Sequence, residues 1–235
     1  MADVNEGILE DLRGELEVNS HTRKSNWFGN EGFEIRTPVV RKISSDYFKL
    51  VKDLSKKEIF GLCGILIESG KIEERTISFD WAFRLKGVFE KSDFYVFENW
   101  VGDFLRDWRD CDDFCTHALG DFLVQYPEFI ECVKEWASSD NWVLRRASIV
   151  SLIYGIRRGK FLDEVFDLTI KLSGDSHYLV NKGVGWALKE SSNLFPHRVF
   201  GFVCDNVGRM SRITLRYSIE KYPREKRDFV LESLK

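Results

Sequence analysis

The sequence is poor in proline and contains no paired cysteine motif. Only four prolines occur in 235 residues, so most of the chain lacks the residue that interrupts an α-helix. The five cysteines are odd in number and form no Cys-x-x-Cys pair, which argues against a disulfide framework and against a structural zinc site. We therefore expect reduced thiols that are mostly buried.

Long apolar runs are also missing. No stretch approaches the ~18 residues that a membrane-spanning helix requires, and the acidic start MADVNEGILEDL does not resemble a signal peptide. Hydrophobic residues make up 43% of the chain and charged residues 31%, as in globular proteins. These features predict a cytoplasmic protein without a membrane partner. A length of 235 residues allows one elongated domain or two small ones.

The small net charge of −3 hides an uneven distribution. Residues 1–140 hold 18 Lys and Arg against 28 Asp and Glu, a net charge of −10, whereas residues 141–235 hold 17 against 10, a net charge of +7. A basic C-terminal part favours contact with a polyanion, although a solvated basic surface explains the same counts.

Apolar residues recur at spacings of three and four, which predicts an all-α fold. The stretches FIECVKEW, LRRASIVSLIY and FLDEVFDLTIKL each place an apolar stripe on one helix face. The prolines in YPEF, FPHR and YPRE stand where helices can begin. No Asn-Gly hairpin signal separates alternating runs, so strands are not expected.

A weak internal repeat appears in the second half of the chain. Intervals of 34, 36 and 34 residues separate Trp108, Trp142, Tyr178 and Arg212, and the residues four positions later are Asp112, Arg146, Lys182 and Arg216. Such intervals are typical of stacked helix-pair repeats of the HEAT or armadillo type. A spacing of four places both members of each pair on one helix face, so stacking predicts a solenoid with the second set along one, concave, wall.

The repeated charges have two explanations. A structural ladder, in which each charge bonds to its neighbour, is the common one in repeat proteins. Arg146, Lys182 and Arg216 are consecutive cations, however, and repel one another unless an anion lies between them. This observation favours a binding surface for an anion.

The stretch RDWRDCDDFC at 106–115 crowds four carboxylates around one tryptophan, which indicates a site for a cation. A zinc site made of Cys111, Cys115 and His117 lacks the common ligand spacing, and a magnesium site for a nuclease lacks a second carboxylate motif. We expect neither metal nor cofactor.

The stretch GNEGFEIRTP at 29–38 lacks a phosphate-loop pattern and is predicted to be a helix-entry loop, with Arg36 as a further candidate for DNA contact.

Four segments carry a resemblance to a known family: FEIRTPVVRKI at 33–43, DWRDCDDF at 107–114, SDNWVLRRASIV at 139–150 and NKGVGWALKE at 181–190. They resemble the AlkD-like DNA alkylation repair family of HEAT-like-repeat DNA glycosylases. The resemblance implies a single domain over residues 1–235, folded as an all-helical concave solenoid that binds duplex DNA and excises cationic N3- or N7-alkylated purines.

The resemblance also implies roles for single residues. The family's Trp-x-x-x-Asp motif matches Trp108 and Asp112, the arginine of its Leu-[Gln/Arg]-Arg motif matches Arg146, and its second aromatic residue matches Trp186. The DNA phosphates would then contact Arg145, Arg146, Lys182, Arg212 and Arg216. The neighbouring Asp107, Asp110 and Asp113, together with the acidic net charge, depart from the expectation for a DNA-binding protein.

These residue types suit the implied reaction. A base alkylated at N3 or N7 is already cationic and leaves without a proton from a general acid, so the main task is to stabilise the oxocarbenium-like sugar, for which Asp112 is the candidate. An indole face attracts a cation by roughly 0.5–2 kcal/mol, which suits Trp108 and Trp186. Both could instead be core residues, where tryptophan usually lies, and we expect Trp100, Trp136 and Trp142 there.

We therefore predict a monomeric, monofunctional alkylpurine DNA glycosylase of base excision repair, associated with the nucleoid. One alternative is a protein of the same fold that binds branched DNA without excision. The other is a helical-repeat scaffold that binds another protein.

Overall fold

The computed structural model describes residues 2–20 and 32–233. Throughout these residues the regular secondary structure is helical and no strand occurs, so the predicted all-α class is confirmed. No helix in the same residues is long and apolar enough to cross a membrane. The chain divides into two compact units, Met1–Asp113 and Phe114–Lys235, whereas the expected single domain over 1–235 stays a prediction.

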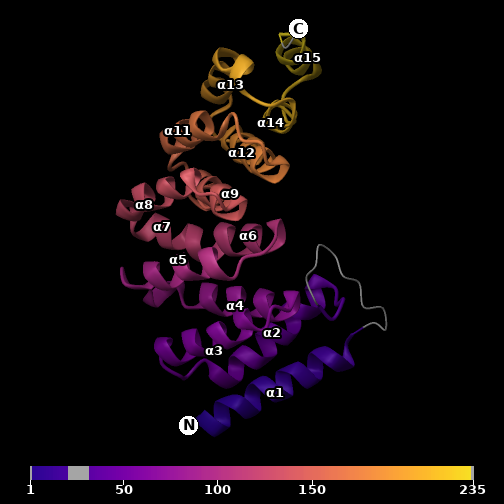
Figure 1. The fold of residues 1–235 in the computed structure, drawn as a ribbon, viewed down its shortest axis with the longest axis vertical. Coiled ribbons are helices and arrows are strands. Elements are labelled where there is room, and N and C mark those ends of the chain that lie inside the picture. Colours follow the sequence, from indigo (N-terminus) through magenta and orange to yellow (C-terminus); the bar gives the residue numbers. More distant parts are fainter. Residues whose placement is uncertain (1, 21–31, 234–235) are drawn as a thin grey trace. The chain divides into compact units, whose positions relative to one another are not determined.

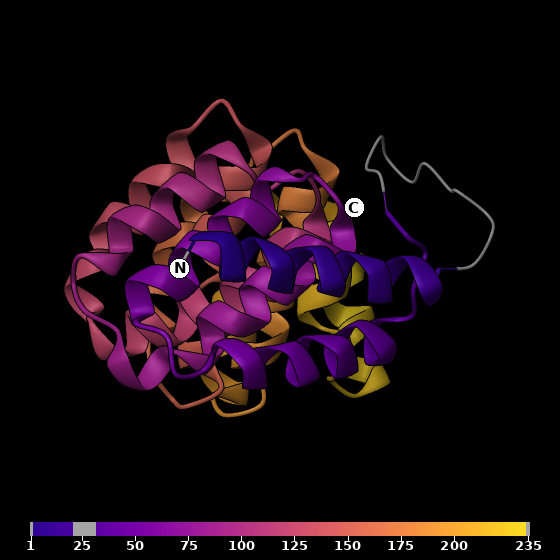
Figure 2. The same cartoon turned by 90° about the horizontal axis from the view of Figure 1, so that it is seen from below.

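Unit 1 is a stack of helices around an aromatic core. Helix α4 packs against both α3 and α2, and α1 lies along α2 (Figures 1 and 2). The Trp81 indole of α4 is fully buried and donates a hydrogen bond of 3.1 Å to the backbone oxygen of Ser44. The helices of this unit are α1 (Ala2–Val18), α2 (Thr37–Val51), α3 (Lys56–Glu68), α4 (Ile72–Arg84), α5 (Asp93–Asp103) and α6 (Trp108–Phe114), whose last residue begins unit 2.

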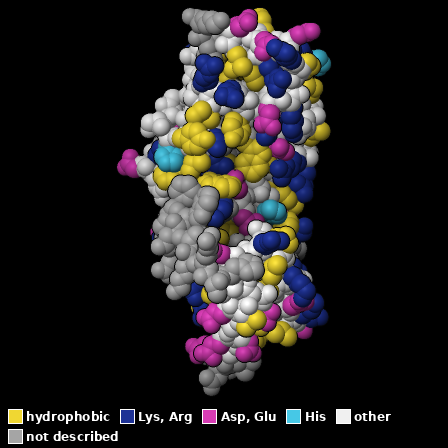
Figure 3. Space-filling view, turned by 90° about the vertical axis from the view of Figure 1, so that its right-hand side faces the viewer, with side chains coloured by type: hydrophobic (Ala, Val, Ile, Leu, Met, Phe, Trp, Pro, Cys, Tyr) yellow, Lys and Arg dark blue, Asp and Glu magenta, His cyan; other side chains and the backbone are white. Residues whose placement is uncertain are grey.

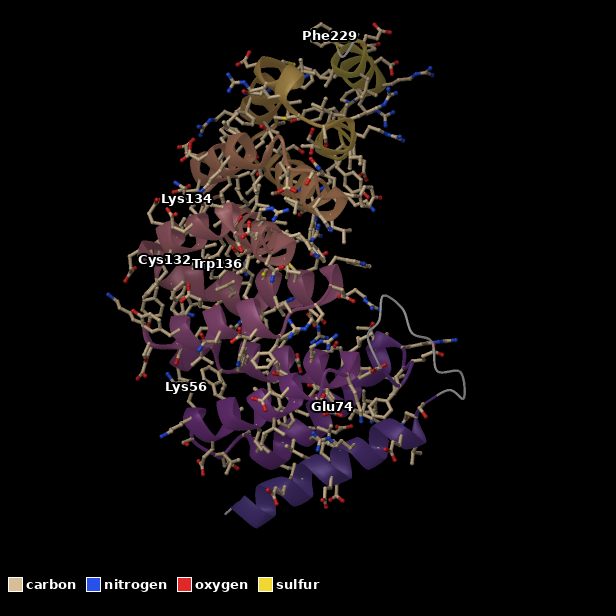
Figure 4. The ribbon with its side chains drawn as sticks, viewed as in Figure 1. Lys56, Glu74, Cys132, Lys134, Trp136 and Phe229 are labelled. Carbon is tan, nitrogen blue, oxygen red and sulfur yellow. The ribbon has the colours of Figure 1, made fainter. Side chains whose placement is uncertain are left out.

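Ion pairs join the helices of unit 1 at their edges. The Lys56 ammonium at the start of α3 lies 2.9 Å from a carboxylate oxygen of Asp93 on α5, and the Arg13 guanidinium of α1 lies 3.0 Å from that of Glu74 on α4. Lys56 and Glu74 are labelled in Figure 4. These ion pairs between side chains therefore add to the apolar packing that holds the helices of unit 1 together.

Unit 2 is built around α12, which packs against α9 on one side and α14 on the other. The Thr214 hydroxyl of α14 donates to the backbone oxygen of Asn181 on α12 at 3.1 Å. A π-helical turn, Cys115–Leu119, precedes the regular helices of this unit. These are α7 (Gly120–Gln125), α8 (Ile130–Glu135), α9 (Trp142–Val150), α10 (Ile153–Ile156), α11 (Leu162–Leu172), α12 (Tyr178–Ser191), α13 (Pro196–Asp205), α14 (Arg212–Ser218) and α15 (Arg224–Glu232).

The expected helix starts at proline are confirmed. Pro127 opens a 3-10 turn before α8, Pro196 is the first residue of α13, and Pro223 immediately precedes α15. The continuous helix expected over LRRASIVSLIY is wrong, because a turn at residues 151–152 separates α9 from α10. Ser148 and Ser151 bond to backbone oxygens of their own helix, a competition that disfavours regular helix.

The buried aromatic residues follow expectation with one exception. Trp100 and Trp136 are 5% and 7% exposed, as predicted for core residues. Trp142 is half-buried and stacks on the His177 ring with centroids 4.3 Å apart, so its assignment to the core is wrong.

Cys132 is exposed, whereas Cys63, Cys111 and Cys115 are buried, and none of the five cysteines forms a disulfide. Cys132 of α8 and Trp136, the residue that follows this helix, are labelled in Figure 4.

A glycine allows a close contact between two helices of unit 2. A Cβ atom at Gly185 of α12 would lie 2.5 Å from the Tyr217 Cβ and 2.8 Å from the Thr214 backbone oxygen. Neither neighbour is the flexible end of a side chain, so α12 and α14 would have to separate.

We expect Gly185→Ala to lower the free energy of unfolding by about 1–3 kcal/mol, the usual cost of overpacking. Gly201→Ala is the matched control, because a Cβ at that position in α13 meets nothing within 4 Å and alanine favours a helix over glycine. Urea unfolding of the two variants measures the difference. Equal stability of the two would contradict the packing argument.

Candidate functional site

The four aspartates in and immediately before α6 differ in their surroundings. Asp107 precedes the helix and accepts hydrogen bonds from the backbone N–H groups of Arg109 at 2.8 Å and Asp110 at 3.2 Å. Its second oxygen lies 2.7 Å from the Arg109 guanidinium. Asp107 is therefore an N-cap of α6, which explains one carboxylate of the crowded stretch.

Asp110 holds α6 onto α4. Its carboxylate lies 3.0 Å from the Arg75 guanidinium, and the two side chains are only 3% and 1% exposed. It also accepts the backbone N–H of Arg106 at 3.1 Å. Burial raises the pKa of Asp110, and the Arg75 charge opposes that rise. This buried pair fixes the position of α6.

Trp108 and Asp112 stand one helical turn apart on α6 and line one open hollow in unit 1. The hollow measures about 650 Å³. The Trp108 side chain is 39% exposed, unusually high for an indole, and Asp112 is half-buried. Asp113 also lines the hollow and forms an ion pair with Arg41 of α2. The other lining residues are Gly32, Glu34, Ile35, Arg36, Thr37, Arg41, Ile72, Glu73, Thr76 and Arg109.

The internal repeat corresponds to the first turns of four helices. Trp108, Trp142, Tyr178 and Arg212 are the first residues of α6, α9, α12 and α14. The residue before each one accepts a backbone N–H at its side chain, and these capping residues are Asp107, Asn141, His177 and Ser211. Burial lowers the pKa of His177, which favours the neutral ring that accepts this bond. These caps were not predicted from the sequence, although Asp, Asn and Ser are the expected residue types at such positions.

The neighbouring arginines of α9 both have protein partners. Arg146 is 4% exposed and donates to the backbone oxygen of Leu179. The Arg145 guanidinium lies 2.6 Å from the Asp175 carboxylate. Burial of Asp175 acts to raise its pKa, but the hydrogen bond from Arg145 and the backbone N–H of His177 prevail and lower it.

Lys182 and Arg216 line a second hollow, of about 710 Å³, in unit 2. The Lys182 ammonium lies 4.6 Å from the Tyr178 ring centroid and 5.5 Å from that of Tyr217. Arg216 is exposed, as is Arg212 one turn earlier. Figure 3 shows basic and hydrophobic side chains interspersed on the face of unit 2 to which α12, α14 and α15 contribute. Within unit 2, cations and aromatic rings thus share one surface.

Trp186 is half-buried in the middle of α12. The Arg157 guanidinium lies 6.0 Å from its ring centroid and 3.0 Å from the Glu190 carboxylate. The indole is therefore neither sealed in the core nor fully exposed. No group of three metal-ligating side chains arranged to hold an ion occurs within residues 2–20 and 32–233.

Comparisons with known proteins identify the family of the chain. A family model described as DNA alkylation repair enzyme matches residues 15–222. The chain belongs to this family. None of the curated proteins matches it.

Solved structures show the same fold at low sequence identity. A predicted DNA alkylation repair enzyme from Enterococcus faecalis is 13% identical, with a TM-score of 0.73 over 93% of this chain and 96% of the other. AlkD2 from Streptococcus mutans is 18% identical, with a TM-score of 0.65 over 92% and 99%. The protein smu.31 from Streptococcus mutans UA159 is 19% identical, with a TM-score of 0.52 over 84% and 96%. The fold of this chain is that of AlkD-like helical-repeat proteins.

The different environments of Asp110 and Asp112 predict different effects on stability. We expect Asp110→Asn to lower the free energy of unfolding by about 3–5 kcal/mol, because it leaves the buried Arg75 charge without its counter-ion. Asp112→Asn is the matched comparison on the same helix and should lower stability less than Asp110→Asn, because Asp112 is only half-buried. Thermal or urea unfolding of both variants measures this. A larger loss of stability for Asp112→Asn than for Asp110→Asn would contradict the assignment of Asp110 as the residue that holds α6 onto α4.

Proposed function

We propose that this protein is a monofunctional DNA glycosylase that removes cationic N3- or N7-alkylated purines from duplex DNA in base excision repair. The observation that supports this most is the placement of Trp108 and Asp112 on one turn of α6, lining one hollow, in a member of the DNA alkylation repair enzyme family.

The proposed reaction breaks the bond between C1′ of the sugar and the alkylated base. The electron pair of that bond goes to the base, which leaves as a neutral alkylpurine, and a water molecule adds its oxygen to C1′ and loses a proton. Asp112 would stabilise the positive charge that develops on the sugar and orient the water. Electrostatic stabilisation of this kind often supplies a large share of catalysis.

The aromatic residues would supply selectivity. A cationic base over the exposed face of Trp108 gains roughly 0.5–2 kcal/mol relative to a neutral one, which favours damaged nucleotides. We propose the same role for Trp186, whose half-buried indole is already within 6.0 Å of one cation, Arg157.

The DNA backbone would be bound by cations of unit 2. We assign this role to Arg146, Lys182, Arg212 and Arg216, whose contacts would position the duplex without reading its sequence. Arg145 and Arg146 are assigned smaller shares than the exposed Arg212 and Arg216. Asp175 and the backbone oxygens of Ser139 and Asp140 already accept hydrogen bonds from Arg145, and Arg146 is 4% exposed and donates to the backbone oxygen of Leu179.

The decisive variant is Asp112→Asn, tested on methylated duplex DNA for release of 7-methylguanine and 3-methyladenine. We expect release to fall by about 10²- to 10³-fold while DNA binding is kept or strengthened, because a negative charge beside the phosphates is removed. Asp53→Asn, an exposed position outside the hollow, is the charge-matched control and should release both bases normally.

Three other outcomes would redirect the proposal. Unchanged release by Asp112→Asn would move the carboxylate role to Asp113 or elsewhere. Binding of branched DNA by the wild-type protein without release would support a DNA-structure-binding protein. Absence of salt-sensitive DNA binding would support a protein-interaction scaffold.

The phosphate role of Arg146 has its own test. Arg146→Ala should weaken binding to duplexes of different sequence by the same factor, because a phosphate contact carries no sequence information. Fluorescence anisotropy on three unrelated duplexes measures this, with circular dichroism to confirm that the variant is folded at the assay temperature. A loss confined to one duplex would contradict the assignment.

A further inference from the structure

Residues 32–36 form a wall of the unit 1 hollow, and α6 contributes Trp108 and Asp112 to the same hollow. This segment, here called the strap, has neither helix nor strand and leads directly into α2 at Thr37. A backbone of this kind keeps its place only if other groups satisfy its hydrogen bonds.

The carboxylate of Glu73 on α4 holds the strap. One of its oxygens accepts the backbone N–H of Phe33 at 2.9 Å, and the other accepts that of Ile35 at 3.2 Å. Glu73 is only 4% exposed, so water competes little for these bonds. The Lys71 ammonium adds a contact 4.5 Å from the Phe33 ring centroid.

The backbone of the strap is constrained between these two bonds. Glu34 has a φ of +57°, in the left-handed region that residues other than glycine rarely adopt. A Cβ atom at Gly32 would lie 2.8 Å from a Glu73 carboxylate oxygen, so glycine at this position lets the carboxylate approach the strap closely. Glu73 therefore determines the path of the chain that ends at Arg36.

Arg36 differs from the other arginines that line the hollow. Arg41 pairs with Asp113 and Arg109 pairs with Asp107. Arg36 is exposed and forms no ion pair with any residue that the structure describes. Its charge is thus available to a ligand.

The hollow needs such a cation if DNA is to enter it. Four carboxylate side chains line it, those of Glu34, Glu73, Asp112 and Asp113. Their negative charge repels a phosphate backbone, and a cation at the rim offsets this repulsion while it leaves Asp112 facing the sugar.

We propose that Arg36 binds a DNA backbone phosphate at the rim of the unit 1 hollow, and that Glu73 is the positioning residue that holds the strap so that Arg36 reaches it. This inference rests on the proposed DNA substrate and adds one contact residue and one positioning residue to it.

The first test is the salt dependence of DNA binding. For Arg36→Ala we expect the slope of log affinity against log salt concentration to fall by about 0.9, the value for one phosphate contact on duplex DNA. Arg36→Lys should keep most of the slope, because the charge remains. Lys57→Ala removes an exposed cation of α3 that does not line the hollow, and it should leave the slope unchanged. An Arg36→Ala slope equal to that of Lys57→Ala would overturn the phosphate contact.

The second test is a double-mutant cycle with Glu73→Gln. The amide keeps one acceptor and replaces the other by an NH₂ group, so one strap bond is lost. We expect Glu73→Gln to lower DNA affinity in the wild-type background and to have little further effect in the Arg36→Ala background. Additive losses, which a purely structural role would give, would overturn the positioning role. Hydrogen exchange at the Phe33 and Ile35 amides should be faster in Glu73→Gln, and unchanged exchange would also contradict it.

These measurements are independent of base release. If the wild-type protein binds duplex DNA and releases no base, the glycosylase proposal fails, and the strap proposal is still judged by the salt slope and the cycle. If it releases bases and Arg36→Ala binds DNA as the wild type does, only the strap proposal fails.

Discussion

Three consecutive charged residues in the first turn of α4 are buried, and each holds a different part of unit 1. Glu73 binds the strap, Glu74 binds Arg13 of α1, and Arg75 binds Asp110 of α6. Successive residues of a helix point about 100° apart, so one turn can reach three directions. A buried charge that loses its partner is costly, and this cost specifies where the three elements lie. The hollow depends on these buried contacts, because the strap and α6 supply two of its walls.

Hydrogen bonds and ion pairs likewise give the acidic residues in RDWRDCDDFC separate roles. Asp107 closes the first turn of α6, Asp110 anchors the helix, and Asp113 pairs with Arg41. The acids are crowded in sequence, but the helix directs them to different cations. Of the four, Asp112 and Asp113 line the hollow.

The helical class could be predicted from periodicity because amphipathic spacing reflects burial on one face. The four matching first turns could be predicted from the intervals between Trp108, Trp142, Tyr178 and Arg212. The break after Val150 could not be predicted in this way, because it depends on serine hydroxyls that bond to their own helix. The strap could not be predicted either, since Phe33 and Ile35 meet Glu73 from 40 and 38 positions away. Only the tertiary structure brings them together. The sequence did contain a signal for these contacts, because Glu73, Glu74 and Arg75 are three adjacent charged residues in the first turn of a helix.

The capped first turns have a consequence for changes in chain length. The intervals between successive first residues are 34, 36 and 34, yet each of the four helices starts at the corresponding residue. Since each cap is a local bond within two or three residues of the helix start, the connecting segments absorb the two extra residues. Insertions and deletions between these helices can therefore occur without rotating the side chains of any first turn to another face.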